Sequence, residues 1–397
     1  MRISTAHAHD AAIDSMARRQ RDLTETQQHL VEGKRVLRAS DDPAAAGRVE
    51  RALAAEARST ANLRAVEASR TATLQTESAL GDAGELLQQA REAMLAAGNA
   101  SYGDPERKSL AVQIQSIRQQ LLAVANRSDG AEGHLFGGQG AALPPFVEAP
   151  GGVQFRGTGG GLLVASDEAL ALSLDGRATW LSAPTGNGVF ETKAVTGTGA
   201  WIDGGRVTLP ASLTGATYSV NFSVSAGVTT YSVLSNGAPT ALTNVNYVSG
   251  QAIEIDGLSF TITGAPAAGD QFQALPSTPT LSVFDALDRT AADLATPSRT
   301  GAQISQSTAR DLRDIDSLMS RLQATRTETG QTLNRIDSVA DRQASLKLQA
   351  QTERSSAEDL DMVQAIAEFQ NRQSGYDAAL KSYSMVQRLS LFQYLNV

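Results

Sequence analysis

The sequence GKRVLRASDDPAAA, residues 33–46, separates two long helical segments and decides how the first third of the chain is built. Asp42 is a favoured N-cap residue, and Pro43 then occupies the first helical position, where its missing N–H costs nothing. We therefore expect one helix to end before Ala39 and another to begin at Pro43 and continue to about Ala97. The chain is predicted to start as helix, break and helix.

The segment before this break carries one heptad-like apolar face. Its positions alternate between spacings of three and four residues and are Ile13, Met16, Gln20, Leu23, Gln27 and Leu30. Two of the six positions are glutamine, and a buried amide needs a hydrogen-bond partner. The seam is therefore weak for an isolated coiled coil and favours a helix that folds only when it is packed among others.

A second cap-and-proline pair, Asp104-Pro105, follows the expected end of the long helix at Gly98-Asn99. The helix that it starts carries the most regular apolar seam of the chain, which is Leu110, Ile114, Ile117, Leu121 and Val124. This seam is predicted to lie in a core. The predicted helix caps of the chain are Asp42, Pro43, Asp104 and Pro105.

The middle of the chain has a different composition. Residues 141–280 hold only 13 charged residues but 20 of the 34 glycines. Alternating residues from Tyr218 to Val224 predict a half-buried strand, and Asp256-Gly257 between two alternating runs is the preferred signal for a type I′ hairpin. The middle is predicted to be an inserted β domain, a small sandwich or barrel-like fold.

Helical patterning resumes near Val283 and continues to the end of the chain, with a break around Pro297. Its last part repeats the four–three spacing at Met362, Ile366, Phe369, Gln373, Tyr376, Leu380 and Tyr383. The C-terminal tip is apolar, and an exposed apolar tip is an aggregation hazard. We therefore expect the tip to dock against another surface.

These patterns predict an α+β multidomain protein with long N- and C-terminal helices and an inserted all-β domain. The two helical arms can bury their apolar faces against each other, in a coiled-coil or helical bundle, or against neighbouring molecules. Three parts are expected. Residues 1–38 and 362–397 would form a terminal coiled-coil layer, residues 39–140 and 281–361 a helical rod, and residues 141–280 the β domain.

Composition excludes several classes of function. The net charge of −8 argues against nucleic-acid binding or a polybasic membrane patch, and the lack of cysteine removes disulfides and thiolate metal sites. The N-terminus lacks a Sec signal pattern, and no apolar run approaches the roughly 18 residues of a transmembrane helix. No membrane insertion is expected.

Catalytic and ligand-binding patterns are weak. His7 and His9 point in different directions on a helix, which disfavours a metal pair. The glycine run 157–161 lacks the spacing of a phosphate loop, and the acidic residues 358–361 fit the start of a helix better than a cation site. We expect no catalytic site, no cofactor and no bound metal.

Five stretches in order resemble the bacterial flagellin superfamily, and within it the hook-associated junction proteins. They are residues 33–46, residues 126–138, residues 262–266 with 269–272, Gly330 with residues 334–336, and residues 382–384 with 389–395. Gln393 departs from the aspartate that is more usual at its position. The resemblance covers both helical arms and only the distal edge of the β domain.

The resemblance implies that the terminal helices form an inner coiled-coil layer and that the β domain projects outward. It implies export through the flagellar type III apparatus to the cell exterior, with an export chaperone as a partner. The other implied partners are the first hook-associated protein, flagellin, and further copies of the chain in a ring.

The apolar residues of the two arms are the predicted assembly interface. They are Ile3, Ile13, Met16, Leu23, Leu30, Met362, Ile366, Phe369, Tyr376, Leu380, Tyr383, Leu389, Leu391, Tyr394 and Leu395.

Two alternatives remain open. The chain could be a flagellin filament subunit, which shares the helical termini. It could also be an extracellular carbohydrate-binding or adhesin-like module on a helical stalk, with Trp180 or Trp201 lining a sugar groove.

Overall fold

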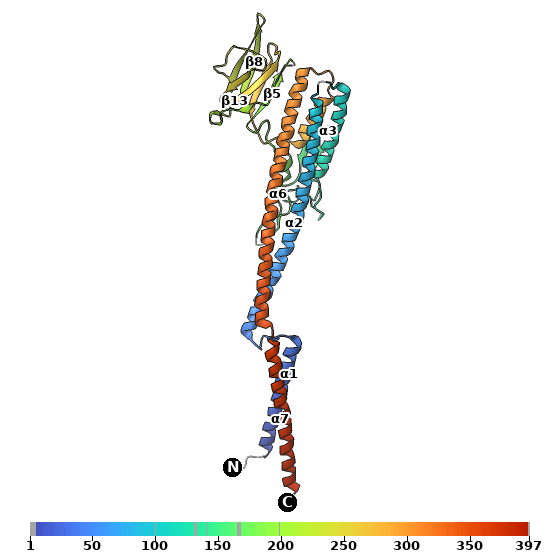
Figure 1. Ribbon diagram of the computed structural model, residues 1–397, viewed down its shortest axis with the longest axis vertical. Helices are drawn as coiled ribbons and strands as arrows, with labels where there is room; N and C mark the ends of the chain where they lie inside the picture. The colour runs from blue at the N-terminus through green and yellow to red at the C-terminus, as the bar shows by residue number, and fades with distance from the viewer. Residues whose placement is uncertain are drawn as a thin grey trace. The chain divides into compact units, whose positions relative to one another are not determined.

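The computed structural model describes residues 5–395 apart from residues 100, 131–132, 141, 165–167 and 198. Its chain divides into two compact units (Figure 1). The terminal unit combines Met1–Arg64 with Val339–Val397, and the central unit is Ala65–Ser338. Two long helices contribute residues to both units.

Long helices occupy both ends of the chain. The helices are α1 (Thr5–Glu32), α2 (Pro43–Ala97), α3 (Asp104–Ala125), α4 (Gly176–Trp180), α5 (Val283–Ala295), α6 (Gly301–Glu358) and α7 (Met362–Leu395), with a 3-10 turn at Pro210–Ser212. The break predicted before Pro43 and the helix end predicted at Ala97 are confirmed. None of the helices in the described part of the chain is long and apolar enough to cross a membrane.

In the terminal unit, polar contacts join α2 to α6. Ala52 of α2 and Ala350 and Ala357 of α6 are almost completely buried. Glu56 of α2 accepts hydrogen bonds from Gln351 at 2.8 Å and from Arg354 at 2.9 Å on α6. Glu56 therefore links the two helices within this unit.

The strands belong to the central unit. They are β1 (Phe146–Ala149), β2 (Gly152–Phe155), β3 (Leu163–Val164), β4 (Leu170–Ala171), β5 (Phe190–Thr196), β6 (Ala200–Ile202), β7 (Arg206–Val207), β8 (Tyr218–Ser225), β9 (Val228–Ser235), β10 (Ala238–Pro239), β11 (Val245–Asn246), β12 (Ala252–Ile255), β13 (Leu258–Gly264) and β14 (Gln271–Pro276). One antiparallel sheet has the order β10-β9-β8-β14-β5, with β11 also on β9. A second has the order β12-β13-β6, with β7 also on β13. The pairs β1-β2 and β3-β4 form separate ribbons.

The two larger sheets share one apolar core, so the domain is a small sandwich. From β8, Tyr218, Val220 and Phe222 point inward, as their alternation predicts, and the ring of Phe222 meets Phe272 edge to face at 5.9 Å. Val224 at the end of the same strand is instead 42% exposed. The buried face therefore covers only the first part of the alternating segment.

The predicted hairpin between β12 and β13 is confirmed. Asp256 and Gly257 both have positive φ, at 45° and 79°, as a type I′ turn requires. A Cβ atom at Gly257 would lie 2.2 Å from the carbonyl oxygen of Leu209. Glycine is therefore required here both by its own backbone conformation and by the close approach of the backbone at Leu209.

A second core in the central unit lies among α2, α3, α5 and α6. The predicted seam of α3 supplies Ile114, Ile117 and Leu121, each at most 2% exposed. Trp180 is fully buried in this core, edge to face with Phe136 and stacked on Phe284. Because its ring is enclosed by protein, it is unavailable to line a sugar groove, which contradicts its part in the carbohydrate alternative.

The observed architecture confirms the predicted fold class, with long terminal helices around an inserted antiparallel β domain. The predicted three-part division at residues 38, 140, 280 and 361 remains a proposal. The helix breaks at Glu32–Pro43 and Glu358–Met362 lie close to two of these boundaries.

Candidate assembly interface

The terminal unit contains a short backbone pairing between its two helix breaks. Residues 33–35, after α1, lie antiparallel to residues 358–360, at the end of α6, and we call these two segments the crossover turn. The N–H of Arg35 donates to the carbonyl of Glu358 at 2.7 Å. This pairing therefore holds the two helix breaks against each other.

Side chains reinforce the crossover turn. The guanidinium of Arg35 donates to the carbonyl of Ala357 at 2.9 Å and to the carboxylate of Asp42 at 3.1 Å. Lys34 forms an ion pair with Glu358. Arg35 thus links the end of α6 to the cap of α2.

Two carboxylates order the chain as it enters α2. Asp41 accepts the N–H groups of Leu37 and Arg38 at 3.0 and 2.8 Å, and Asp42 accepts the N–H of Ala45 at 2.9 Å, which is N-cap geometry. The hydrogen bond from Arg38 is the main cause that lowers the pKa of Asp41. The bond from Ala45 does the same to the pKa of Asp42.

The predicted capping role of Asp104 is wrong. Gly103 is the N-cap of α3, and Asp104 is already inside the helix, which also moves Pro105 to the second helical position. The backbone N–H of Gly103 is held by the side chain of Glu106 at 2.9 Å, and Asp104 instead accepts the N–H of Ser298 at 3.0 Å. An Asp-Pro pair alone does not distinguish these two registers.

The helices α1 and α7 pair antiparallel within the terminal unit. Near one end of the pair the hydroxyl of Tyr383 lies 3.0 Å from Nδ1 of His9. Further along, the guanidinium of Arg372 donates to the carbonyl of Asp22 at 3.0 Å. The sequence suggests only a metal-binding role to be weighed for His9 and does not reveal this contact, because spacing within one helix says nothing about the partner helix.

Pairing leaves the predicted seam only half covered. Ile13, Met362, Ile366 and Leu380 are between 42% and 46% exposed. Intermediate exposure is found at Met16, Leu23, Leu30, Phe369, Tyr376 and Tyr383. Ile3 and the side chains of Leu389, Leu391, Tyr394 and Leu395 lie outside the described residues.

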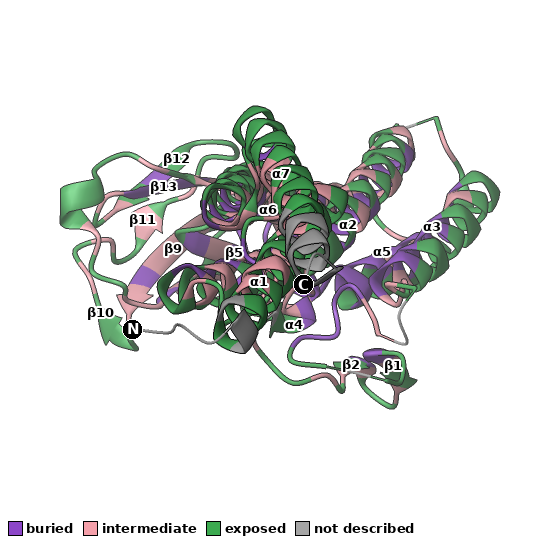
Figure 2. Ribbon diagram, turned by 90° about the horizontal axis from the view of Figure 1, so that it is seen from below, coloured by how far each residue is buried: buried purple, intermediate pink, exposed green. Residues whose placement is uncertain are grey.

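Few side chains in this pair are fully buried. Among the described side chains of α1 and α7, only Thr26 and Ala365 reach that state. Figure 2 shows the contrast, with exposed and intermediate residues along α1 and α7 and a continuous buried face on α5. The helix pair therefore presents two incomplete apolar seams to its surroundings.

The acidic residues 358–361 are explained by the helix break. Glu358 and Asp359 close α6, and Asp361 accepts the N–H groups of Val363 and Gln364 at 3.0 and 3.2 Å at the start of α7. Over the part of the chain that the structure describes, no group of three or more potential metal ligands is present.

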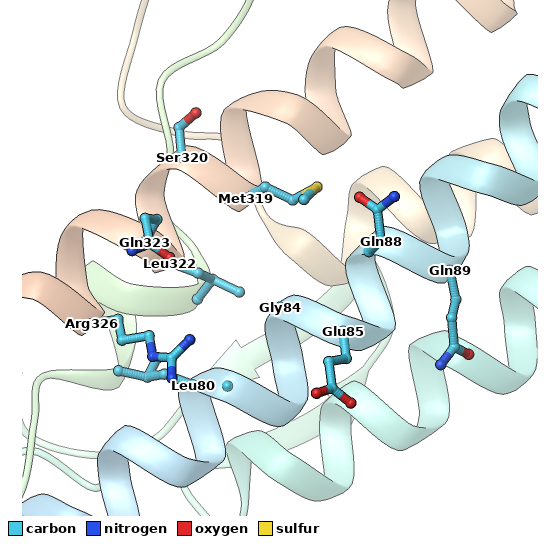
Figure 3. A pocket seen from close by; sticks show the side chains of 11 residues that line it. Leu80, Gly84, Glu85, Gln88, Gln89, Met319, Ser320, Leu322, Gln323 and Arg326 are labelled. Carbon is cyan, nitrogen blue, oxygen red and sulfur yellow. The ribbon is translucent and has the colours of Figure 1, made fainter.

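A groove within the central unit lies between α2 and α6 (Figure 3). It has a volume of about 910 Å³ and is open along Gly81 and Gly84, which have no side chains to fill it. Its charged lining residues are Glu85 and Arg326, and Arg326 is paired with Glu77. The remaining side chains that line the groove carry amide, hydroxyl or aliphatic groups. They do not form the arrangement of acid and base groups that a catalytic site needs.

The N-terminal part of the chain resembles a known protein family. Residues 3–141 match the family model of the bacterial flagellin N-terminal helical region. The match relates this N-terminal part of the chain to bacterial flagellins.

The chain is also similar to flagellar hook-associated protein 3 of Salmonella typhimurium, with 32% identity over 152 residues. The match covers 38% of this chain and 48% of that protein, so it spans about half of the relative's length.

Two solved structures are similar over more of the chain. FlgL of Xanthomonas campestris has 28% identity and a TM-score of 0.69, covering 77% of this chain and 99% of that one. The flagellar junction protein FlgL of Legionella pneumophila has 25% identity and a TM-score of 0.65, covering 70% of this chain and 95% of that one.

Proposed function

We propose that this protein is a structural component of the bacterial flagellum that joins the hook to the filament. It binds the first hook-associated protein on one side and flagellin on the other, in a ring of its own copies. The observation that carries the proposal is the similarity to FlgL structures over nearly their whole length.

The half-covered seams of α1 and α7 supply the driving force for assembly. Packing against neighbouring subunits completes the burial of side chains such as Ile13, Ile366 and Leu380, which are more than 40% exposed in the single chain. Completing the burial of one such side chain contributes on the order of 1 kcal/mol. The predicted interface residues of both arms act together in this contact.

A junction needs different surfaces for its two neighbours, because the contacts above and below are heterologous. The loosely packed helix pair also suits a chain that leaves the cell unfolded through the flagellar type III apparatus and orders at its destination. We propose an extracellular location on the flagellum, an export chaperone as a transient partner, and no enzymatic activity.

The flagellin alternative makes a different prediction. A filament subunit polymerises alone into long filaments, whereas a junction protein does not. Electron microscopy of the concentrated, purified chain distinguishes the two.

Gene deletion tests the proposal directly. Cells that lack this protein are expected to keep their hooks, lose their filaments and release monomeric flagellin into the medium. Normal filaments on the deletion strain would contradict the proposed function.

Complementation with single variants tests the role of the seam. We expect Ile366→Asp to fail to restore filaments, because a carboxylate would be buried against the neighbouring subunit. Val112→Asp on α3 is the matched control, since Val112 is 62% exposed and belongs to no predicted seam. If both variants failed equally to restore filaments, the α7 seam would have no special role in assembly.

A further inference from the structure

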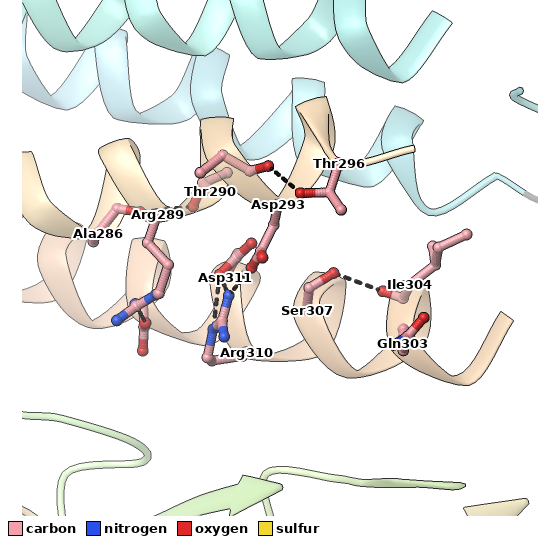
Figure 4. Close-up of polar contacts among 12 residues, drawn as sticks. Ala286, Arg289, Thr290, Asp293, Thr296, Gln303, Ile304, Ser307, Arg310 and Asp311 are labelled. Carbon is pink, nitrogen blue, oxygen red and sulfur yellow. Dashed lines mark hydrogen bonds and ion pairs between the residues drawn. The ribbon is translucent and has the colours of Figure 1, made fainter. Parts of the chain in front are cut away.

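A dense ionic cluster lies between α5 and α6 in the central unit. Its charged side chains are Arg289 and Asp293 on α5 and Arg310, Asp311, Arg313 and Asp314 on α6. Figure 4 shows Asp293 of α5 and Asp311 of α6 converging on Arg310. Arg310 donates to one oxygen of Asp311 through Nε at 3.0 Å and Nη2 at 2.8 Å, and it also binds Asp293.

Two carboxylates of this cluster are removed from water. The side chain of Asp311 is fully buried, and that of Asp314 is 9% exposed with Arg289 as its ion-pair partner. The second oxygen of Asp311 is buried, and among the described residues it has no hydrogen-bond partner. Holding both carboxylates ionised in this position is costly.

The β domain brings more negative charge to the same place. Arg313 donates to the hydroxyl of Thr192 on β5 at 3.0 Å, and the carboxylates of Glu191 and Asp203 act on its guanidinium. A Cβ atom at Gly204 would lie 2.5 Å from Cδ of Arg313, so the chain of the β domain lies directly against this side chain.

Charge counting then shows an imbalance. Three guanidinium groups are surrounded by five carboxylates, which are Asp293, Asp311, Asp314, Glu191 and Asp203. The groups that act directly on Asp314 are Arg289 from α5 and Arg310, Arg313 and Asp311 from α6. One bound proton would reduce the excess of negative charge.

We propose that Asp314 is a proton-binding site that strengthens the packing of α5, α6 and the β domain in mildly acidic surroundings. The site is independent of the proposed flagellar role, because it belongs to the interior of the central unit.

The direction of the effect follows from linkage. Burial raises the pKa of Asp314 from 3.8 to about 6, partly opposed by Arg289, and burial also raises the pKa of Asp311. The folded chain therefore binds the proton more tightly than the unfolded chain. Between pH 6 and pH 4 the free energy of unfolding rises as the pH falls.

Thermal unfolding of the full chain between pH 7.5 and pH 5 tests the proposal. We expect the Tm of the wild-type chain to rise by about 2 °C across this range. Asp314→Asn should unfold at a higher temperature than wild type at pH 7.5 and should lose most of the rise.

Asp316→Asn is the matched control, because Asp316 lies on the same helix with a half-exposed side chain paired to Arg91. The Tm of this variant should rise towards pH 5 as much as that of wild type. Arg289→Met should move the rise to higher pH, since it removes the guanidinium that favours the ionised form. The proposal would be overturned if the Tm of wild type and that of Asp314→Asn changed in parallel with pH. It would also be overturned if the Tm of wild type fell towards pH 5.

Discussion

The helix α3 in the central unit and the helices α1 and α7 in the terminal unit carry the same four–three spacing but use it differently. In α3, Ile114 and Leu121 are completely buried. In the α1–α7 pair, Ile13 and Ile366 remain more than 40% exposed. The difference teaches that spacing identifies an apolar face but does not say how many elements cover it.

Two physical features separate these helices. The seam of α3 is wholly aliphatic and is enclosed by a core built from several helices. The seams of α1 and α7 include Gln20, Gln27 and Gln373, and all three remain exposed to water in the single chain. An amide that keeps its water avoids a desolvation cost, so the looser packing is consistent with the sequence.

The largest expected effect is a difference in stability loss between substitutions in the two kinds of seam. Leu121→Ala should reduce the free energy of unfolding by about 2–5 kcal/mol, because it leaves a cavity in a closed core. Ile366→Ala should cost less than about 1 kcal/mol in the monomer, because the side chain is already half in water. Urea denaturation of both variants measures this, and equal losses would erase the distinction.

A smaller effect is expected at the crossover turn. Arg35→Ala removes the hydrogen bonds to Ala357 and Asp42 and should cost about 1 kcal/mol, since the guanidinium is half exposed. Arg38→Ala, three residues further on and exposed, is the control. A larger loss in the control would show that Arg35 does not fix the turn.

The smallest effect concerns the cap of α2 and its dependence on pH. The pKa of Asp42 is lowered on folding, mainly by the N–H of Ala45, so its stabilising effect is fully present above pH 4. It is lost as the pH falls through the lowered pKa. Asp42→Ala should therefore be less stable than wild type at pH 7, and the gap should close towards pH 2 in thermal unfolding curves. A gap that stays constant with pH would contradict the cap.

Local signals predicted most of the fold. Pro43 after Asp42, the alternating residues of β8 and the Asp256-Gly257 turn each rest on short-range geometry, and each lies where its pattern indicates. Asp104 failed because a neighbouring glycine can take the N-cap when Glu106 closes it from inside the helix.

Long-range contacts could not be predicted from the sequence. The pairing of Arg35 with Glu358, the contact of Tyr383 with His9 and the enclosure of Trp180 all join residues that are distant in the chain or in different elements. The sequence does not reveal the ionic cluster, because charged residues in a helix ordinarily lie on a face exposed to solvent.

Hydrogen exchange of the purified monomer tests the central claim, that the terminal helices belong to the assembled state more than to the single chain. We predict rapid exchange of the backbone amides across α1 and α7 and strong protection across α3 and α5, measured by mass spectrometry in one sample. Protection of α1 and α7 equal to that of α3 would contradict the account.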